Sequence, residues 1–189
     1  FTLDANIQNS QWVIKNAVGM KEESFTSTIA NHITKIEFQL SEYRFPNQPT
    51  KPVMQSWPNV AEKLMEDPDF GLSFLRLNDW LSDDLKKIKA GTNTQEELAK
   101  KIYEFIRDNF TSTGDYGLYL SDNTNLKDIL KRKSGKACEL NLLLLAMLHY
   151  ENIKCKPVLM SLRERGKAHT FYPLMDRFNY LVVQVEIGP

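Results

Sequence analysis

The sequence has few of the residues from which disulfide scaffolds, metal sites and membrane spans are built. It contains two cysteines and three histidines in 189 residues. Two cysteines are too few for a disulfide scaffold, and no cysteine or carboxylate lies at metal-ligand spacing from His32, His149 or His169. No apolar run approaches the roughly 18 residues that indicate a membrane-spanning helix. We therefore expect no metal, no cofactor and no membrane span.

The chain also lacks an excess of charge of either sign. Its 24 Lys and Arg residues equal its 24 Asp and Glu residues in number, so no global field favours nucleic acid or an anionic membrane. A hydrophobic content of 42% is enough to bury a core. Because the chain begins without Met, and its last apolar run stops at Gly188 and Pro189 where a hairpin partner could follow, we expect truncation at both ends.

The pattern of the chain changes near residue 45. Residues 11–15 form a strand candidate, and residues 36–40 alternate apolar and polar side chains, which predicts strands with one buried face. Three prolines within residues 45–52 then break any regular element. We predict that residues 1–45 end a β-rich domain. Residues 46–93 are expected to form a helical connector with helices over residues 53–65 and 77–89.

The remaining residues, 94–189, predict an α+β core. Thr94 and Glu97 match a capping box that opens a helix running to about Phe110. A short helix is predicted over residues 126–133, and a second helix over residues 138–150. The second helix is apolar on nearly every side and must be buried. Residues 154–162 and 178–187 are predicted strands.

Cys138 stands at the amino end of the buried helix. Unpaired backbone N–H groups and the helix dipole favour a thiolate at such a position. Position alone nevertheless favours packing as a small apolar residue over catalysis. The next residue, Glu139, is expected to cap the helix or to pair with Lys136.

Residues 130–148 and 152–159 together resemble the nucleophile segment of the bacterial transglutaminase-like superfamily. In that family a glycine shortly before the cysteine and an acidic residue shortly after it open a buried helix, which feeds the first strand of a papain-like sheet. The helix that begins at Thr94 is similar to the helix that starts such cores. The resemblance implies a papain-like or transglutaminase-like fold, with a buried helix bearing Cys138, the nucleophile, against an antiparallel sheet.

The N-terminal segment carries a second resemblance. Residues 11–23 and 36–40 are similar to the end of the β-rich domain of unknown function that precedes such cores in bacterial envelope proteins. This resemblance implies an exported protein, located in the periplasm or at the cell surface.

The chain departs from the family at the catalytic base. The family places a histidine at the start of the following strand, and Tyr180 occupies that position here. A phenol with a reference pKa near 10 is a poor base at neutral pH, and losing a general base costs about 10² to 10⁴ in rate. The expected carboxylate would lie beyond Pro189. His169 is the alternative base, with Asp176 or Glu186 to orient it.

Three hypotheses follow from these patterns. The first is a transglutaminase-like domain that is catalytically impaired and serves a structural or binding role. The second is an active cysteine acyltransferase or amide or peptide hydrolase that uses Cys138. The third is an interaction domain in which the N-terminal β segment binds. The expected partner is a peptide, a protein or a cell-wall fragment, and not nucleic acid.

Overall fold

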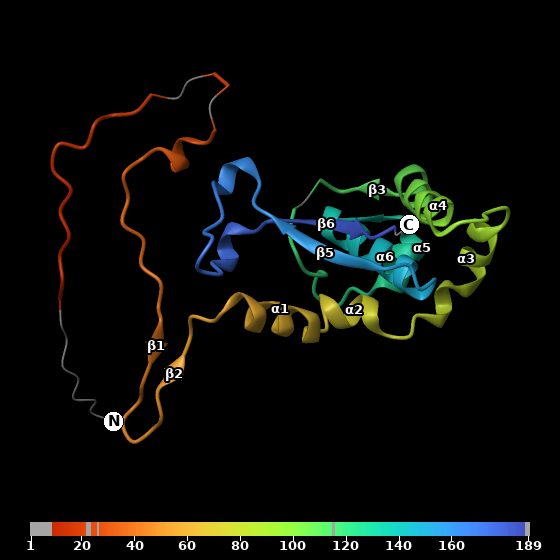
Figure 1. Ribbon diagram of the computed structural model, residues 1–189, viewed down its shortest axis with the longest axis horizontal. Helices are drawn as coiled ribbons and strands as arrows, with labels where there is room; N and C mark the ends of the chain where they lie inside the picture. The colour runs from red at the N-terminus through yellow and green to blue at the C-terminus, as the bar shows by residue number, and fades with distance from the viewer. Residues whose placement is uncertain (1–8, 22–23, 26, 115, 188–189) are drawn as a thin grey trace.

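The computed structural model describes residues 9–21, 24–25, 27–114 and 116–187. The described residues before the first α-helix form an extended arm to one side of a helical part (Figure 1). The elements are, in chain order, η1 (Ile29–Asn31), β1 (Glu42–Tyr43), β2 (Lys51–Pro52), α1 (Trp57–Glu66), α2 (Gly71–Leu75), η2 (Asp79–Leu81), α3 (Ser82–Lys89), α4 (Gln95–Asn109), β3 (Thr111–Ser112), α5 (Leu126–Arg132), β4 (Ser134–Gly135), α6 (Ala137–Tyr150), β5 (Cys155–Met160), η3 (Arg163–Arg165), η4 (Met175–Arg177) and β6 (Tyr180–Val185).

Helix α6 is the centre of the hydrophobic core. Every residue from 142 to 148 is buried, which confirms the prediction drawn from its apolar sequence. Helices α2, α4 and α5 and both strands of the β5–β6 sheet pack against it. An all-round apolar helix requires this arrangement, because each of its faces must be removed from water.

Local capping signals set the ends of the helices near the core. The Thr94 hydroxyl accepts a hydrogen bond from the backbone N–H of Glu97 at 3.1 Å. The Glu97 carboxylate accepts one from the backbone N–H of Asn93 at 2.7 Å. Asn125 caps α5, which ends at Lys133 in the left-handed conformation, with φ of 54°. The predicted α4 and α5 are therefore confirmed, and the capping residues explain where they begin.

The two predicted strands of the core are also confirmed. β5 and β6 pair antiparallel, with Met160 opposite Tyr180 and Cys155 opposite Val185. Residues 161–179 connect them and contain η3 and η4. The buried side chain of Leu181 belongs to the same core cluster as the apolar residues of α6. Helices and small sheets together give the α+β fold that the sequence predicts.

The predicted strands of the N-terminal arm are not formed. Residues 11–15 and 36–40 have no strand, and the described strands before α1 are β1 and β2, which pair antiparallel over two residues each. An alternating segment becomes a strand only when another strand supplies its backbone hydrogen bonds. Without such a partner the apolar row stays exposed, and Phe38 is 69% exposed. The expectation of strands here was wrong for this reason.

The connector helices are shorter than predicted. α1 begins at Trp57 because the Ser56 hydroxyl caps it and Pro58 occupies its first turn. The helix predicted over residues 77–89 is the short η2 followed by α3. α1 and α2 meet closely at Gly71, where a Cβ atom would lie 2.2 Å from the backbone of Met65. No helix in the described part of the chain is long and apolar enough to cross a membrane.

Leu142→Ala should lower the free energy of unfolding by about 2–5 kcal/mol, because the Leu142 side chain is fully buried in the middle of the core. Urea unfolding measures the change. The matched control is Leu77→Ala, since Leu77 is 84% exposed and its truncation should change stability by less than about 0.5 kcal/mol. Equal losses in the two variants would contradict the described core.

Candidate functional site

Cys138 lies in the first turn of α6, and its sulfur contacts residues 116–121, which we call the covering segment. The cysteine is 1% exposed. Its Sγ donates a hydrogen bond to the backbone oxygen of Tyr119 at 3.3 Å. A Cβ atom placed on Gly117 would lie 3.5 Å from the same sulfur. The covering segment therefore passes directly over the thiol.

Two opposing effects act on the Cys138 thiol. Burial is the larger effect and raises its pKa, because the thiolate loses the solvation of water. The backbone N–H of Glu139 and the positive charge of Lys136 act in the opposite direction. The net pKa is raised. The helix-start effect predicted from the sequence is thus present, but burial outweighs it.

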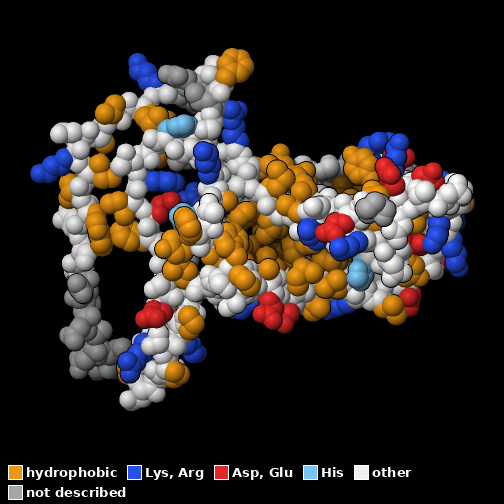
Figure 2. Space-filling model, in the orientation of Figure 1, with side chains coloured by type: hydrophobic (Ala, Val, Ile, Leu, Met, Phe, Trp, Pro, Cys, Tyr) orange, Lys and Arg blue, Asp and Glu red, His pale blue; other side chains and the backbone are white. Residues whose placement is uncertain are grey.

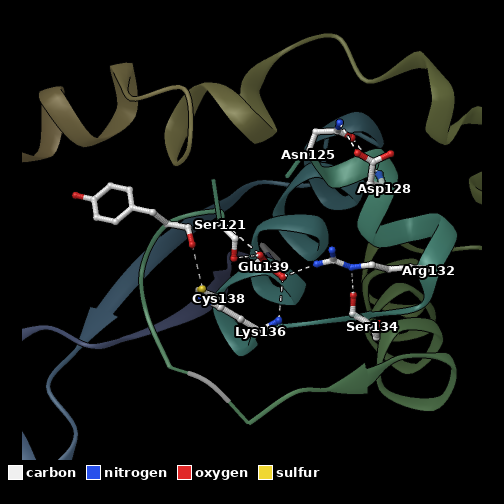
Figure 3. Close-up of polar contacts among 9 residues, drawn as sticks. Ser121, Asn125, Asp128, Arg132, Ser134, Lys136, Cys138 and Glu139 are labelled. Carbon is white, nitrogen blue, oxygen red and sulfur yellow. Dashed lines mark hydrogen bonds and ion pairs between the residues drawn. The ribbon is translucent and has the colours of Figure 1, made fainter. Parts of the chain in front are cut away.

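The carboxylate of Glu139 is the most highly connected polar group beside Cys138 (Figure 3). Its Oε1 accepts hydrogen bonds from the backbone N–H of Ser121 at 3.2 Å and from the Ser121 hydroxyl at 2.7 Å. Its Oε2 accepts from Nη2 of Arg132 at 2.8 Å and from the backbone N–H of Lys136 at 3.0 Å. Glu139 is only 1% exposed. One carboxylate thus joins the covering segment, the end of α5 and the start of α6.

The turn between α5 and α6 is shaped to receive this carboxylate. Nε of Arg132 donates to the backbone oxygen of Ser134 at 2.7 Å, which holds the guanidinium along the turn. A Cβ atom on Gly135 would lie 2.9 Å from Oε2 of Glu139. Residues 134–135 form β4, which pairs parallel with β3. Glycine at position 135 is therefore needed for the close approach of the carboxylate.

Glu139 is stabilised in its charged form. Burial by itself would raise its pKa, but the hydrogen bonds from Ser121 and Lys136 and the charge of Arg132 outweigh burial, and the pKa is lowered. The helix cap expected from the sequence is confirmed by the Lys136 N–H contact. The ion pair is made with Arg132 rather than with Lys136. One feature of the sequence indicates this role, because Glu139 is the one acidic residue of α6, a helix that is otherwise mostly apolar.

Tyr180 begins β6 and contacts the same covering segment. Its ring lies 5.6 Å from the ring of Tyr116 in an edge-to-face arrangement. Because Tyr116 directly precedes Gly117, the segment over the Cys138 sulfur is also the segment against which Tyr180 packs. Tyr180 is therefore placed where it can support the covering segment.

His169 makes its contacts within its own loop. Its Nδ1 accepts hydrogen bonds from the backbone N–H groups of Phe171 and Tyr172, both at 3.2 Å. Its ring lies 4.9 Å from the ring of Tyr172. None of the hydrogen bonds of His169 to the described residues reaches Cys138. The structure does not connect this alternative base to the thiol.

Neither of the two carboxylates considered as orienting groups forms a hydrogen bond with His169. Glu186 forms ion pairs with Lys154 at 2.5 Å and Lys156 at 3.2 Å. Asp176 and His169 line one cavity of about 370 Å³, and no hydrogen bond between their side chains is found. A hydrogen-bonded Cys–His–carboxylate arrangement is not assembled among the described residues.

The remaining histidines lie outside the site. His149 is in the last turn of α6, about three turns from Cys138 along the helix. His32 shares a hydrogen bond of 2.6 Å with the Ser27 hydroxyl in the N-terminal arm. Within the described ranges, no group of three or more His, Cys, Asp or Glu side chains could hold a metal ion.

Comparison with protein families gives one decisive match. The model of the transglutaminase-like superfamily matches residues 84–185, which is more than half of the chain. The chain belongs to the transglutaminase-like superfamily. The matched range contains Cys138, Glu139 and Tyr180. The family resemblance seen in the sequence of the core is therefore confirmed.

Comparison with curated proteins finds no match. Among solved structures, the transglutaminase-like chain is similar to a candidate protease from Parabacteroides distasonis ATCC 8503, at 14% sequence identity and a TM-score of 0.48. The similarity covers 67% of this chain and 23% of the other. This chain thus spans less than a quarter of the length of that protein.

Glu139→Gln should lower the free energy of unfolding at neutral pH by about 1–3 kcal/mol, because charge-assisted hydrogen bonds to a buried group are weakened. The folded-state pKa of Glu139 is lowered, so its contribution is fully present above the ordinary glutamate pKa of about 4.3. That contribution is lost as the pH falls through the lower folded value. Urea unfolding across a pH series should therefore show the two proteins converging in acid.

The control for this experiment is Glu186→Gln, which removes a partly exposed carboxylate paired with two lysines. Its loss of stability should be much smaller than that of Glu139→Gln. A difference between the parent chain and Glu139→Gln that stays constant down to strong acid would contradict the charged, hydrogen-bonded state of Glu139.

Proposed function

We propose that this chain is a catalytically impaired transglutaminase-like domain that serves a structural or binding role in an exported bacterial protein. The observation that carries the proposal is the state of Cys138. Its thiol is buried beneath the covering segment, the pKa of the thiol is raised, and the thiol donates a hydrogen bond to a backbone carbonyl.

Two requirements of cysteine-dependent acyl transfer bear on this proposal. The reaction needs a thiolate within reach of the substrate and a base that takes the thiol proton. A peptide carbonyl such as that of Tyr119 cannot take a proton at neutral pH, and a tyrosine phenol such as that of Tyr180 is a poor base there. Tyr180 at the expected histidine position and the enclosed thiol thus support the same proposal independently.

A binding role is supported by two adjoining cavities, of which the first reaches the covering segment at Tyr119. The first, of about 590 Å³, is lined by residues 39 and 53–55 before α1, by α1, by Tyr119 of the covering segment and by residues 173–176. The second, of about 440 Å³, is lined mainly by apolar and aromatic side chains of α1, α2, β5 and η4. Both volumes lie in the range of about 300–1,000 Å³ that is usual for ligand sites. A peptide, a protein segment or a cell-wall fragment is the ligand class that we propose.

The surface around these cavities fits a binding role. Figure 2 shows hydrophobic side chains gathered in the middle of this face, between the extended arm and the helical end of the molecule. Trp57 of α1 contributes an edge-to-face contact with Phe178 at 5.8 Å and donates a hydrogen bond to the backbone oxygen of Thr170 at 2.8 Å. An exposed apolar patch of this kind is typical of an interaction site.

An activity comparison tests the proposed impairment. The chain and its Cys138→Ala variant should be indistinguishable in amine incorporation into a glutamine-containing peptide and in hydrolysis of the same peptide. Tyr180→His should not restore activity by itself, because the thiol remains covered. Turnover that disappears in Cys138→Ala would contradict the proposal and establish the second candidate, an active cysteine acyltransferase or hydrolase.

The location in the cell is proposed from the N-terminal resemblance. Residues 11–23 and 36–40 resemble the end of a β-rich domain that precedes such cores in bacterial envelope proteins, which supports export to the periplasm or the cell surface. Fractionation of the source bacterium, with an antiserum raised against this domain, should recover the parent protein in the envelope or periplasmic fraction. Recovery in the cytoplasmic fraction alone would contradict this part of the proposal.

A further inference from the structure

We propose that Glu139 is a positioning residue that holds the covering segment over Cys138 and so keeps the thiol shielded. The inference deepens the proposed function and rests on it, since it explains how the Cys138 thiol is prevented from reacting. Figure 3 shows the side chains of Ser121 and Arg132 and the backbone nitrogen of Lys136 arranged around the Glu139 carboxylate, beside the sulfur of Cys138.

The covering segment is attached to the first turn of α6 at two consecutive residues of that helix. Tyr119 accepts the hydrogen of the Cys138 thiol at 3.3 Å. Ser121 gives both its backbone N–H and its hydroxyl to the Glu139 carboxylate. The two attachments lie on either side of position 120, so together they fix the part of the segment that follows Gly117.

The Glu139 attachment is the stronger of the two. A thiol is a weak hydrogen-bond donor, whereas the Ser121 hydroxyl donates to a charged oxygen at 2.7 Å, which makes a charge-assisted bond. Arg132 and the Lys136 N–H hold the same carboxylate from the other side. Glu139 therefore keeps its position independently of the covering segment, and the segment is anchored to it.

Other contacts keep the covering segment near the fold when this attachment is lost. Leu118 and Leu120 are buried in the core, and the backbone N–H of Leu120 donates to the oxygen of Asp69 at 2.9 Å. The ring of Tyr119 packs on Phe70 at 5.9 Å. Loss of the Ser121–Glu139 bonds should therefore loosen the segment locally rather than unfold α6.

Native-state alkylation with iodoacetamide tests the proposal. Cys138 and Cys155 are followed in one mass spectrum over a series of urea concentrations below the unfolding transition. In the parent chain both should react slowly. In Glu139→Gln the rate at Cys138 should rise by about tenfold or more, the factor expected for losing a hydrogen bond to a charged group. This rise should depend only weakly on urea, because little surface opens.

Ser121→Ala is the deciding variant. Removing the Glu139 charge would itself lower the pKa of the nearby thiol, because that charge contributes to raising it. Ser121→Ala keeps the carboxylate and removes only the hydroxyl donor, so a selective rise at Cys138 in this variant can come only from loosening. The rise in labelling rate should be smaller than in Glu139→Gln, since the hydrogen bond from the Ser121 backbone N–H remains. Ser121→Ala also keeps the proposal testable if Glu139→Gln does not fold.

Thr94→Ala is the matched control. It removes the hydroxyl that caps α4 and lowers stability without touching the covering segment. Labelling in this variant should rise at both cysteines together and depend steeply on urea. The inference is overturned if Ser121→Ala and Glu139→Gln behave like Thr94→Ala. Rapid labelling of Cys138 in the parent chain would instead overturn the shielded thiol of the proposed function.

Discussion

The buried charge of Glu139 is the interaction on which the geometry of the site depends. A carboxylate taken out of water is strongly destabilising unless its oxygens receive hydrogen bonds and a compensating charge. Here the donors come from Ser121, Arg132 and Lys136, which belong to three successive parts of the chain. The hydrogen bonds that the Glu139 carboxylate requires therefore hold the covering segment, the α5–α6 turn and the first turn of α6 in place relative to one another.

This arrangement determines the environment of Cys138. Its helix-start position favours a thiolate, but the covering segment that Glu139 holds in place removes water from the sulfur, and burial prevails. The thiol of this transglutaminase-like chain is therefore shielded from water. That Tyr180 takes the place of the catalytic histidine stays a prediction, although its contact with Tyr116 places it beside the covering segment.

The elements of the core were predictable because their signals are local. Caps at Thr94 and Asn125 and the apolar pattern of α6 fix helices from neighbouring residues alone. The strands predicted in the arm are not formed, because a strand depends on a partner strand that the alternation of apolar and polar residues does not reveal. The partners of Glu139 were equally hidden, since Ser121 lies 18 residues away. A lone acidic residue in an apolar helix indicates only that partners must exist.

The pKa of the Cys138 thiol is the quantity that tests this account most directly. The ¹³Cβ chemical shift of Cys138, followed by NMR across a pH series, reports the ionisation of this one sulfur. The account predicts a thiol that remains neutral through pH 7 and titrates above the free-cysteine value of about 8.5. A titration below neutral pH would show an activated thiolate and would contradict both the shielded thiol and the proposed loss of catalysis.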